Sequence, residues 1–126
     1  MRLLLDTHAL LWYAMGDPRI GSEAKVLIDD LDNEAYVSMA ALWEIAIKYS
    51  IGKLELPQPF KPYIAWLLEQ IQVKVLSLQD INMVSELRLY HRDLFDRIMI
   101  AQAHNQDLVF LSGDSKVNQY DIQVIW

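Results

Sequence analysis

The sequence predicts an α/β fold, a three-layer sandwich in which helices flank a mainly parallel central sheet. Short apolar runs alternate along the chain with longer segments that carry apolar residues at helical spacing. Loops of only a few residues join these segments, which is typical of helices packed on a parallel sheet. No repeat, low-complexity tract or interdomain linker breaks the alternation. Residues 1–126 are therefore expected to form one domain.

Five apolar runs are expected to be strands. The first, Arg2–Leu5, stops at the acid Asp6, as expected for a central strand buried on both faces. The remaining strands are expected at residues 34–38, 72–76, 108–111 and 122–125.

Six helices are expected between these strands, most with a recognisable start or stop. Ser22, Ser38 and Asp93 are suitable N-cap residues. Residues 77–80 resemble a capping box. Gly52 is expected to end the helix at residues 40–51. The helices are expected at residues 7–13, 23–31, 40–51, 61–71, 78–90 and 94–105, with a helical turn near residue 116.

The composition limits the function classes. Cysteine is absent, which excludes disulfides, thiolate catalysis and thiolate zinc sites, so a metal must be held by oxygen or by the three histidines. A net charge of −6 argues against a broad basic face that coats nucleic acid. This charge is compatible with a nuclease. If several acids surround divalent cations, the formal net charge overstates the negative field that a substrate meets.

The first residues predict neither a signal peptide nor a membrane span. Arg2 is followed by only three leucines before Asp6 interrupts the apolar run. A cytoplasmic protein without a membrane partner is expected.

Two acids stand at the carboxyl ends of predicted strands. Asp6 follows the first strand, and Asp114 follows the run at 108–111 after a short Ser-Gly step. In open parallel sheets this edge is the usual place for a site, because loops and helix N-termini converge there. A structural alternative is that both acids only cap helices or turns.

Two further acids interrupt apolar helix faces. Glu44 and Asp96 both have apolar residues three, four and seven positions away, so each carboxylate is expected to lean toward the interior. The structural alternatives are an ion pair of Glu44 with Lys48 and a capping box of Asp96 with Asp93.

Buried carboxylates need compensation. Two of them about 4 Å apart repel by about 4 kcal/mol at an effective dielectric near 20. Basic residues can supply part of the compensation, but hard oxygen ligands without cysteine suit Mg²⁺ or Mn²⁺ best. Such ions activate water and stabilise the leaving oxygen of a phosphodiester, so these acids indicate hydrolysis of nucleic acid. The candidate cations are Lys48, Arg92, Arg97 and Lys116.

Several motifs closely resemble PIN-domain toxins of the VapC group. They are LLDTHALLW at residues 4–12, LWEIAIK at 42–48, HRDLFDR at 91–97, SGD at 112–114 and IQVIW at 122–126. The resemblance covers essentially the whole chain in order.

This resemblance implies a PIN-like fold and an Mg²⁺- or Mn²⁺-dependent endoribonuclease that acts on RNA. It also implies the toxin of a bacterial toxin–antitoxin pair, a homodimer silenced by a cognate antitoxin. The positions that match the family's acidic metal site are Asp6, Glu44, Asp96 and Asp114. Supporting roles are expected for Thr7, which can orient Asp6 or a metal-bound water, for Ser112 near the metal, and for Arg97.

The chain departs from the family pattern at two positions. Leu94 stands where many relatives have proline, which should loosen the start of that helix. Gly113 stands where a larger, often basic residue is common. If that residue contacts RNA phosphate, this chain must use another cation, and Arg97 and Lys116 are the candidates.

Two other functions remain open on the sequence. A receiver-like signalling domain has a similar length, an Asp at a strand end and bound Mg²⁺. Such domains also show paired acids after the first strand and a lysine at the end of a late strand, and this chain has neither. A non-catalytic binding module would use the same acids as caps and ion pairs. The four tryptophans are expected in the core or a dimer interface, and the apolar helices at 39–49 and 61–71 are expected to form the antitoxin groove.

Overall fold

The computed structural model describes residues 1–90 and 93–126. Its strands are β1 (Arg2–Leu5), β2 (Glu34–Ser38), β3 (Gln72–Lys74), β4 (Val109–Leu111) and β5 (Val124–Ile125). Its α-helices are α1 (Thr7–Met15), α2 (Ser22–Asp29), α3 (Met39–Ser50), α4 (Phe60–Gln70), α5 (Leu78–Glu86) and α6 (Leu94–Gln106), and a short 3₁₀ helix, η1 (Ser115–Gln119), precedes β5.

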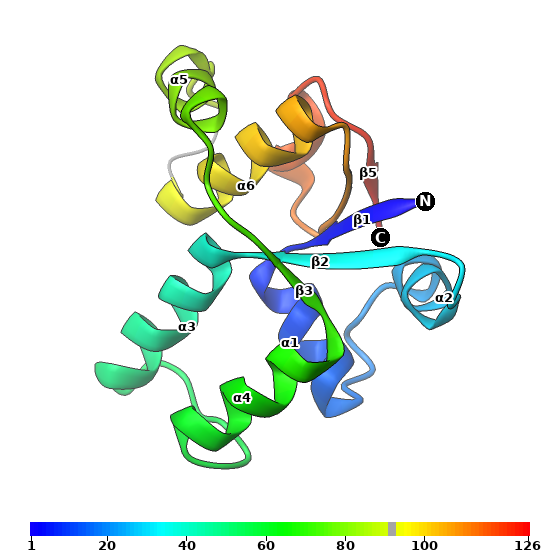
Figure 1. Ribbon diagram of the computed structural model, residues 1–126, viewed down its shortest axis with the longest axis vertical. Helices are drawn as coiled ribbons and strands as arrows, with labels where there is room; N and C mark the ends of the chain where they lie inside the picture. The colour runs from blue at the N-terminus through cyan, green and yellow to red at the C-terminus, as the bar shows by residue number, and fades with distance from the viewer. Residues whose placement is uncertain (91–92) are drawn as a thin grey trace.

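The strands form one sheet in the order β3-β2-β1-β4-β5, and every described pair of neighbours is parallel. Figure 1 shows α5 and α6 on one side of the strands and α1, α2 and α4 on the other. This three-layer arrangement confirms the fold class that the sequence predicts. The chain moves outward from β1 through β2 to β3, crosses back, and continues outward through β4 to β5, so the sheet order reverses next to β1.

β1 is the centre of the core. Leu3, Leu4 and Leu5 are at most 1% exposed, which explains why the run carries no polar alternation. Full burial of a leucine stabilises the fold by about 1.5–3 kcal/mol. Phe110 and Leu111 of β4 lie beside these leucines and are equally buried.

The parallel register brings three chain segments to one edge of the sheet. β1 ends where α1 begins, β2 ends where α3 begins, and β4 ends before the loop that leads to η1. The backbone amide of Asp6 donates a hydrogen bond to the Leu111 carbonyl at 3.1 Å, which fixes the ends of β1 and β4 side by side.

Local capping follows the sequence in most places. Ser38 caps α3, Asp93 caps α6, and Ser77 forms a reciprocal capping box with Asp80. The predicted cap Ser22 is wrong, because Ser22 is already helical and the N-cap is Gly21, which has no side-chain hydrogen bond.

Some predicted boundaries are wrong. The helix expected to reach residue 90 ends at Glu86, because Leu87 turns to extended backbone while its amide closes the last turn on the Met83 carbonyl. The strands expected at 72–76, 108–111 and 122–125 are shorter at one end, since only Gln72–Lys74, Val109–Leu111 and Val124–Ile125 pair with neighbours.

Two of the four tryptophans lie outside the core, so of the two predicted placements, core or dimer interface, only the interface remains open for them. Trp43 on α3 is 57% exposed and Trp66 on α4 is 45% exposed, whereas Trp12 and Trp126 are partly buried. Over residues 1–90 and 93–126 the structure contains no helix with the length and apolar character needed to cross a membrane.

Candidate active site

A cavity of about 560 Å³ opens at the carboxyl edge of the sheet, and carboxylates dominate its lining. The structure brings all four predicted acids to this cavity and adds Asp93, the cap of α6. The acidic residues that line it are Asp6, Glu44, Asp93, Asp96 and Asp114. The other lining residues are His8, Trp12, Arg19, Lys48, Gly113 and Trp126.

Asp6 is 6% exposed and is held by its backbone surroundings. Its Oδ1 accepts a hydrogen bond of 2.7 Å from the Ala9 amide, so the capping role and the cavity position coexist. Burial raises the pKa of the Asp6 carboxyl above its usual value, although the hydrogen bonds from Ala9 and the Ser112 side chain pull that pKa down. Ser112 therefore contacts Asp6, while its expected place near a metal stays a prediction.

Glu44 is 3% exposed and both of its oxygens have partners. Thr7 Oγ1 donates to Glu44 Oε1 at 2.5 Å, and Lys48 Nζ lies 2.5 Å from Oε2. The Thr7 hydroxyl thus meets Glu44 rather than Asp6, which corrects the expected orientation of that side chain. The predicted ion pair with Lys48 is present, and it holds the carboxylate at the cavity rather than away from it.

Asp96 on α6 and Asp114 in the loop after β4 also line the cavity, and both are half-buried. The Asp93 side chain caps α6, because its Oδ1 accepts a 3.0 Å hydrogen bond from the Asp96 backbone amide. The Asp96 residue itself lines the cavity. Asp114 begins η1, and its Oδ1 accepts a 3.0 Å hydrogen bond from the Lys116 amide.

The donor set suits a hard divalent cation, because it consists of carboxylate oxygens with one histidine at the rim. Among the described residues, however, no three acidic or histidine side chains stand close enough to share one ion in their present rotamers. Since Thr7 and Lys48 occupy both oxygens of Glu44, direct ligation by Glu44 requires Lys48 to move.

Two predicted cations lie elsewhere. Arg97 Nη2 donates to the carbonyls of Val84 and Leu87 at 3.2 and 3.3 Å, so Arg97 fastens the end of α5 instead of reaching the cavity. Lys116 does not line the cavity. His91 and Arg92 lie outside the described residues.

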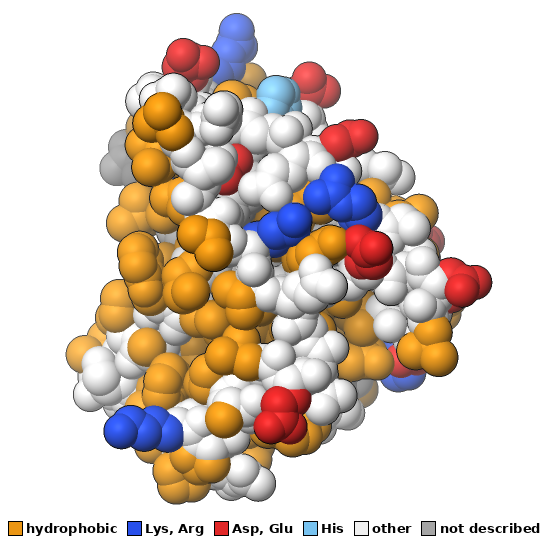
Figure 2. Space-filling model, viewed as in Figure 1, with side chains coloured by type: hydrophobic (Ala, Val, Ile, Leu, Met, Phe, Trp, Pro, Cys, Tyr) orange, Lys and Arg blue, Asp and Glu red, His pale blue; other side chains and the backbone are white. Residues whose placement is uncertain are grey.

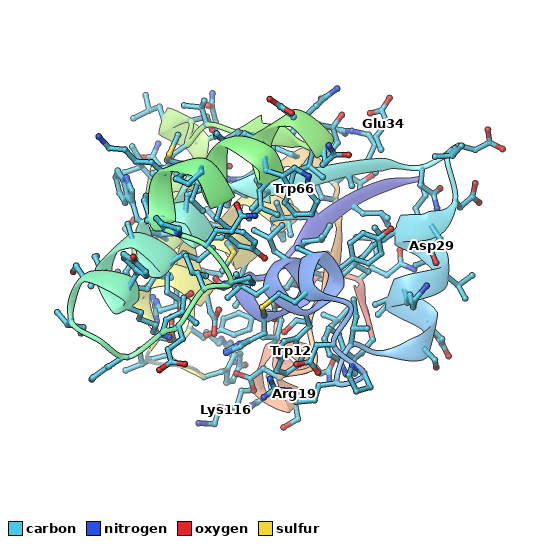
Figure 3. The ribbon with its side chains drawn as sticks, turned by 90° about the horizontal axis from the view of Figure 1, so that it is seen from below. Trp12, Arg19, Asp29, Glu34, Trp66 and Lys116 are labelled. Carbon is cyan, nitrogen blue, oxygen red and sulfur yellow. The ribbon has the colours of Figure 1, made fainter. Side chains whose placement is uncertain are left out.

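An aromatic wall that the sequence reasoning did not find closes one side of the cavity. Trp12 contacts His8 and Trp126, with ring centroids 5.2 and 5.8 Å away, and the Arg19 guanidinium carbon lies 4.8 Å from the Trp12 ring centroid. Figure 3 shows Trp12 and Arg19 together on one side of the molecule, far from Trp66. The only sequence signal was the position of His8 and Trp12 on one face of the helix after Asp6, while nothing local indicated Arg19 or Trp126.

The glycines around Trp126 explain one departure from the family pattern. A Cβ on Gly113 would lie 2.7 Å from Trp126 Cε2, and one on Gly21 would lie 2.7 Å from Trp126 Cγ. Gly113 is therefore small because the indole of Trp126 fills the space where a side chain would stand.

We expect Gly113→Ala to lower the free energy of unfolding by about 1–3 kcal/mol, because the added methyl group overpacks the wall. Urea denaturation followed by tryptophan fluorescence would measure this change. In a Trp126→Ala background the same substitution should cost little. Equal destabilisation in both backgrounds would show that Trp126 is not what Gly113 accommodates.

Comparison with known proteins adds a family to this geometry. The curated protein "Ribonuclease VapC16" of Mycobacterium tuberculosis (strain ATCC 25618 / H37Rv) is 37% identical over 51 residues, which are 37% of this chain and 36% of that protein. The chain thus matches little more than a third of that relative's length.

Solved structures agree in fold over nearly the full chain. VapBC-1 from nontypeable Haemophilus influenzae superimposes with a TM-score of 0.76 at 19% identity, covering 99% of this chain and 97% of that one. A toxin–antitoxin complex from Klebsiella pneumoniae gives a TM-score of 0.69 at 18% identity, covering 98% and 96%.

The sequence match and the architecture lead to the same family. The PIN domain model matches residues 3–123, which include Leu3–Leu5 of β1 and every acid described as lining the cavity. The chain belongs to the PIN domain family.

Proposed function

We propose that this protein is a divalent-metal-dependent endoribonuclease and the toxin of a bacterial toxin–antitoxin pair. The observation that carries the proposal is the convergence of Asp6, Glu44, Asp96 and Asp114 on one cavity from four separate segments. Local capping explains none of the burial of Glu44, and two buried carboxylates at one edge need a cation. The name of the mycobacterial relative supports ribonuclease chemistry.

In this proposal Asp6, Asp96 and Asp114 hold Mg²⁺ or Mn²⁺, and Glu44 completes the acidic set. When bound, the metal supplies an activated water and stabilises charge on the phosphodiester. Thr7 and Ser112 hold the acids in place through the contacts to Glu44 and Asp6. The pairing of Lys48 with Glu44 reduces the net charge that the metal-free cavity must tolerate.

Family membership sets aside the receiver-like domain, so the remaining rival is a non-catalytic binding module on the same fold. That rival needs no metal, because its acids would serve only as caps and ion pairs. The cytoplasmic location stays a prediction from the sequence.

Asp6→Asn and Asp96→Asn should each lower RNA cleavage by about 100-fold or more, since each removes a charge that the metal needs. Asparagine remains a good N-cap at position 6, and it relieves carboxylate repulsion at either site, so the metal-free variants should be equally or more stable. Sequencing the 5′ ends of RNA after incubation, together with thermal melting, would measure both effects. Asp32→Asn, an exposed carboxylate outside the cavity, is the matched control. Unfolding of either variant would mean that the acid is structural.

Added Mg²⁺ or Mn²⁺ should raise the melting temperature of the antitoxin-free protein, because an ion that binds only the native state stabilises it by mass action. At ten times the dissociation constant the gain is about 1.4 kcal/mol, or roughly 5 °C for a chain of this size. The rise should vanish with EDTA and in Asp96→Asn. A melting curve indifferent to both ions would favour the non-catalytic module.

We also propose that the antitoxin binds an exposed apolar surface on α3 and α4. Trp43 and Ile47 of α3 are 57% and 50% exposed, and Trp66 and Leu68 of α4 are 45% and 38% exposed. Figure 2 shows hydrophobic side chains gathered over the side of the molecule where these helices lie. The structural neighbour from Klebsiella pneumoniae is a toxin–antitoxin complex, which supports an antitoxin as the partner that covers this surface. The alternative partner is a second copy of the chain.

Replacing Trp43 and Trp66 together by Ser should weaken binding of the cognate antitoxin by about 30-fold or more, as expected for buried aromatic hot spots. Isothermal titration calorimetry would measure the affinity. The control is Ile81→Ser, which removes a 51% exposed apolar residue from α5 on the other side of the sheet. Unchanged antitoxin affinity with loss of self-association in sedimentation would instead assign the surface to a homodimer.

A further inference from the structure

The acidic cavity has few cations with which to meet an RNA backbone. Among the residues described as lining it, only Arg19 and Lys48 are basic, and the Lys48 ammonium is paired with Glu44. Arg97 is committed to backbone carbonyls, and Lys116 lies off the cavity. Gly113 offers no side chain and its space is filled by Trp126. Within residues 1–90 and 93–126, Arg19 is therefore the cation that remains for a substrate at this wall.

Arg19 is held in a fixed orientation although its side chain is 66% exposed. Its Nε lies 3.1 and 3.2 Å from the two carboxylate oxygens of Asp17, and its Nη2 lies 2.8 Å from Oδ2. The Asp17 carboxylate also accepts the Arg19 backbone amide at 2.9 Å. The Trp12 ring supports the guanidinium from its other side at 4.8 Å. These two contacts restrict the side chain, which reduces the conformational entropy that it loses when it binds a ligand.

The hydrogen bonds of the guanidinium leave a free donor. Those described use Nε and Nη2, and in the described parts of the chain Nη1 donates to no protein acceptor. A guanidinium that binds one oxyanion through this edge keeps its remaining donors for a second, and phosphate is the oxyanion that matches its fork geometry.

We propose that Arg19, braced by Asp17 and stacked on Trp12, binds a phosphodiester of single-stranded RNA next to the carboxylate cavity and so positions the strand for cleavage. The inference rests on the proposed function and adds to it a positioning residue outside the acidic set. It also accounts for the aromatic wall. Trp126 fills the space beside Gly113 and packs on Trp12, and Trp12 in turn presents Arg19 at the rim.

The test compares Arg19→Gln with Arg88→Gln, which removes the same charge from an exposed position that lines a different cavity. Both are made in the Asp96→Asn background so that the RNA stays intact. Fluorescence anisotropy with a labelled single-stranded RNA of twelve nucleotides gives the dissociation constant at several salt concentrations. Arg19→Gln should raise the dissociation constant by about tenfold at low salt and reduce the slope of log K against log salt by about 0.7, the value for one phosphate contact on a single strand. Arg88→Gln should change neither.

A second experiment uses chemically modified RNA. An RNA with one uncharged methylphosphonate at the contacted linkage should bind the parent and Arg19→Gln variants equally, because the partner of Arg19 is gone. An abasic nucleotide that abolishes the difference instead would overturn the phosphate assignment in favour of base stacking. Asp17→Asn should weaken RNA binding only partly, and Arg19→Lys should restore the salt slope without the full affinity.

The outcomes separate this inference from the proposed function. If the unaltered protein neither binds nor cleaves RNA, both fail together. If it cleaves RNA with a divalent ion while Arg19→Gln keeps the parent's affinity and salt slope, only the role of Arg19 is overturned. A loss of melting temperature shared by Asp17→Asn and Arg19→Gln, without any change in RNA binding, would assign the pair to the stability of the turn.

Discussion

The burial of carboxylates at the carboxyl edge of a parallel sheet is the constraint on which the rest of this structure depends. Asp6 and Glu44 are nearly inaccessible, and the cost of an uncompensated buried carboxylate is several kcal/mol. Much of the surrounding structure reduces this cost. The Ala9 amide and Ser112 act on Asp6, and neighbouring side chains hold both oxygens of Glu44. The stability that permits it comes from the leucine core of β1.

The lysine next to Glu44 links the metal-free arrangement to the proposed chemistry. Lys48 is on the same helix, one turn after Glu44, and its ammonium takes one carboxylate oxygen. This pairing raises the pKa of Lys48, with the hydrogen bond to Glu44 as the main cause, so the Lys48 ammonium stays protonated at neutral pH. In our proposal a divalent ion would compete with that ammonium for the Glu44 carboxylate. Lys48 would therefore neutralise Glu44 only while the metal is absent.

The cavity has two walls of different chemistry. One wall consists of carboxylates from the end of β1, from α3, from the start of α6 and from the loop before η1. The other wall consists of Trp12, Trp126 and Arg19. Two glycines make the second wall possible, since a side chain at Gly21 or Gly113 would collide with Trp126. An acidic cavity beside an aromatic and guanidinium surface is the arrangement expected where metal ions and a nucleic acid strand are held together.

The sequence by itself determined the fold class and the order of the elements, and it identified four of the acids that line the cavity. Apolar runs without alternation predict buried parallel strands, and a carboxylate that interrupts an apolar helix face predicts an inward orientation from local periodicity alone. The capping box at Ser77 and the pair of Glu44 with Lys48 were predictable for the same reason, because their partners lie within one helical turn.

Only the tertiary structure decided which cations face the cavity. Arg97 and Arg19 both lie within two residues of an acid in the sequence, but the folded chain turns Arg97 onto the end of α5 and places Arg19 on Trp12. Such choices depend on contacts between separate helices and loops, for which periodicity and capping carry no signal.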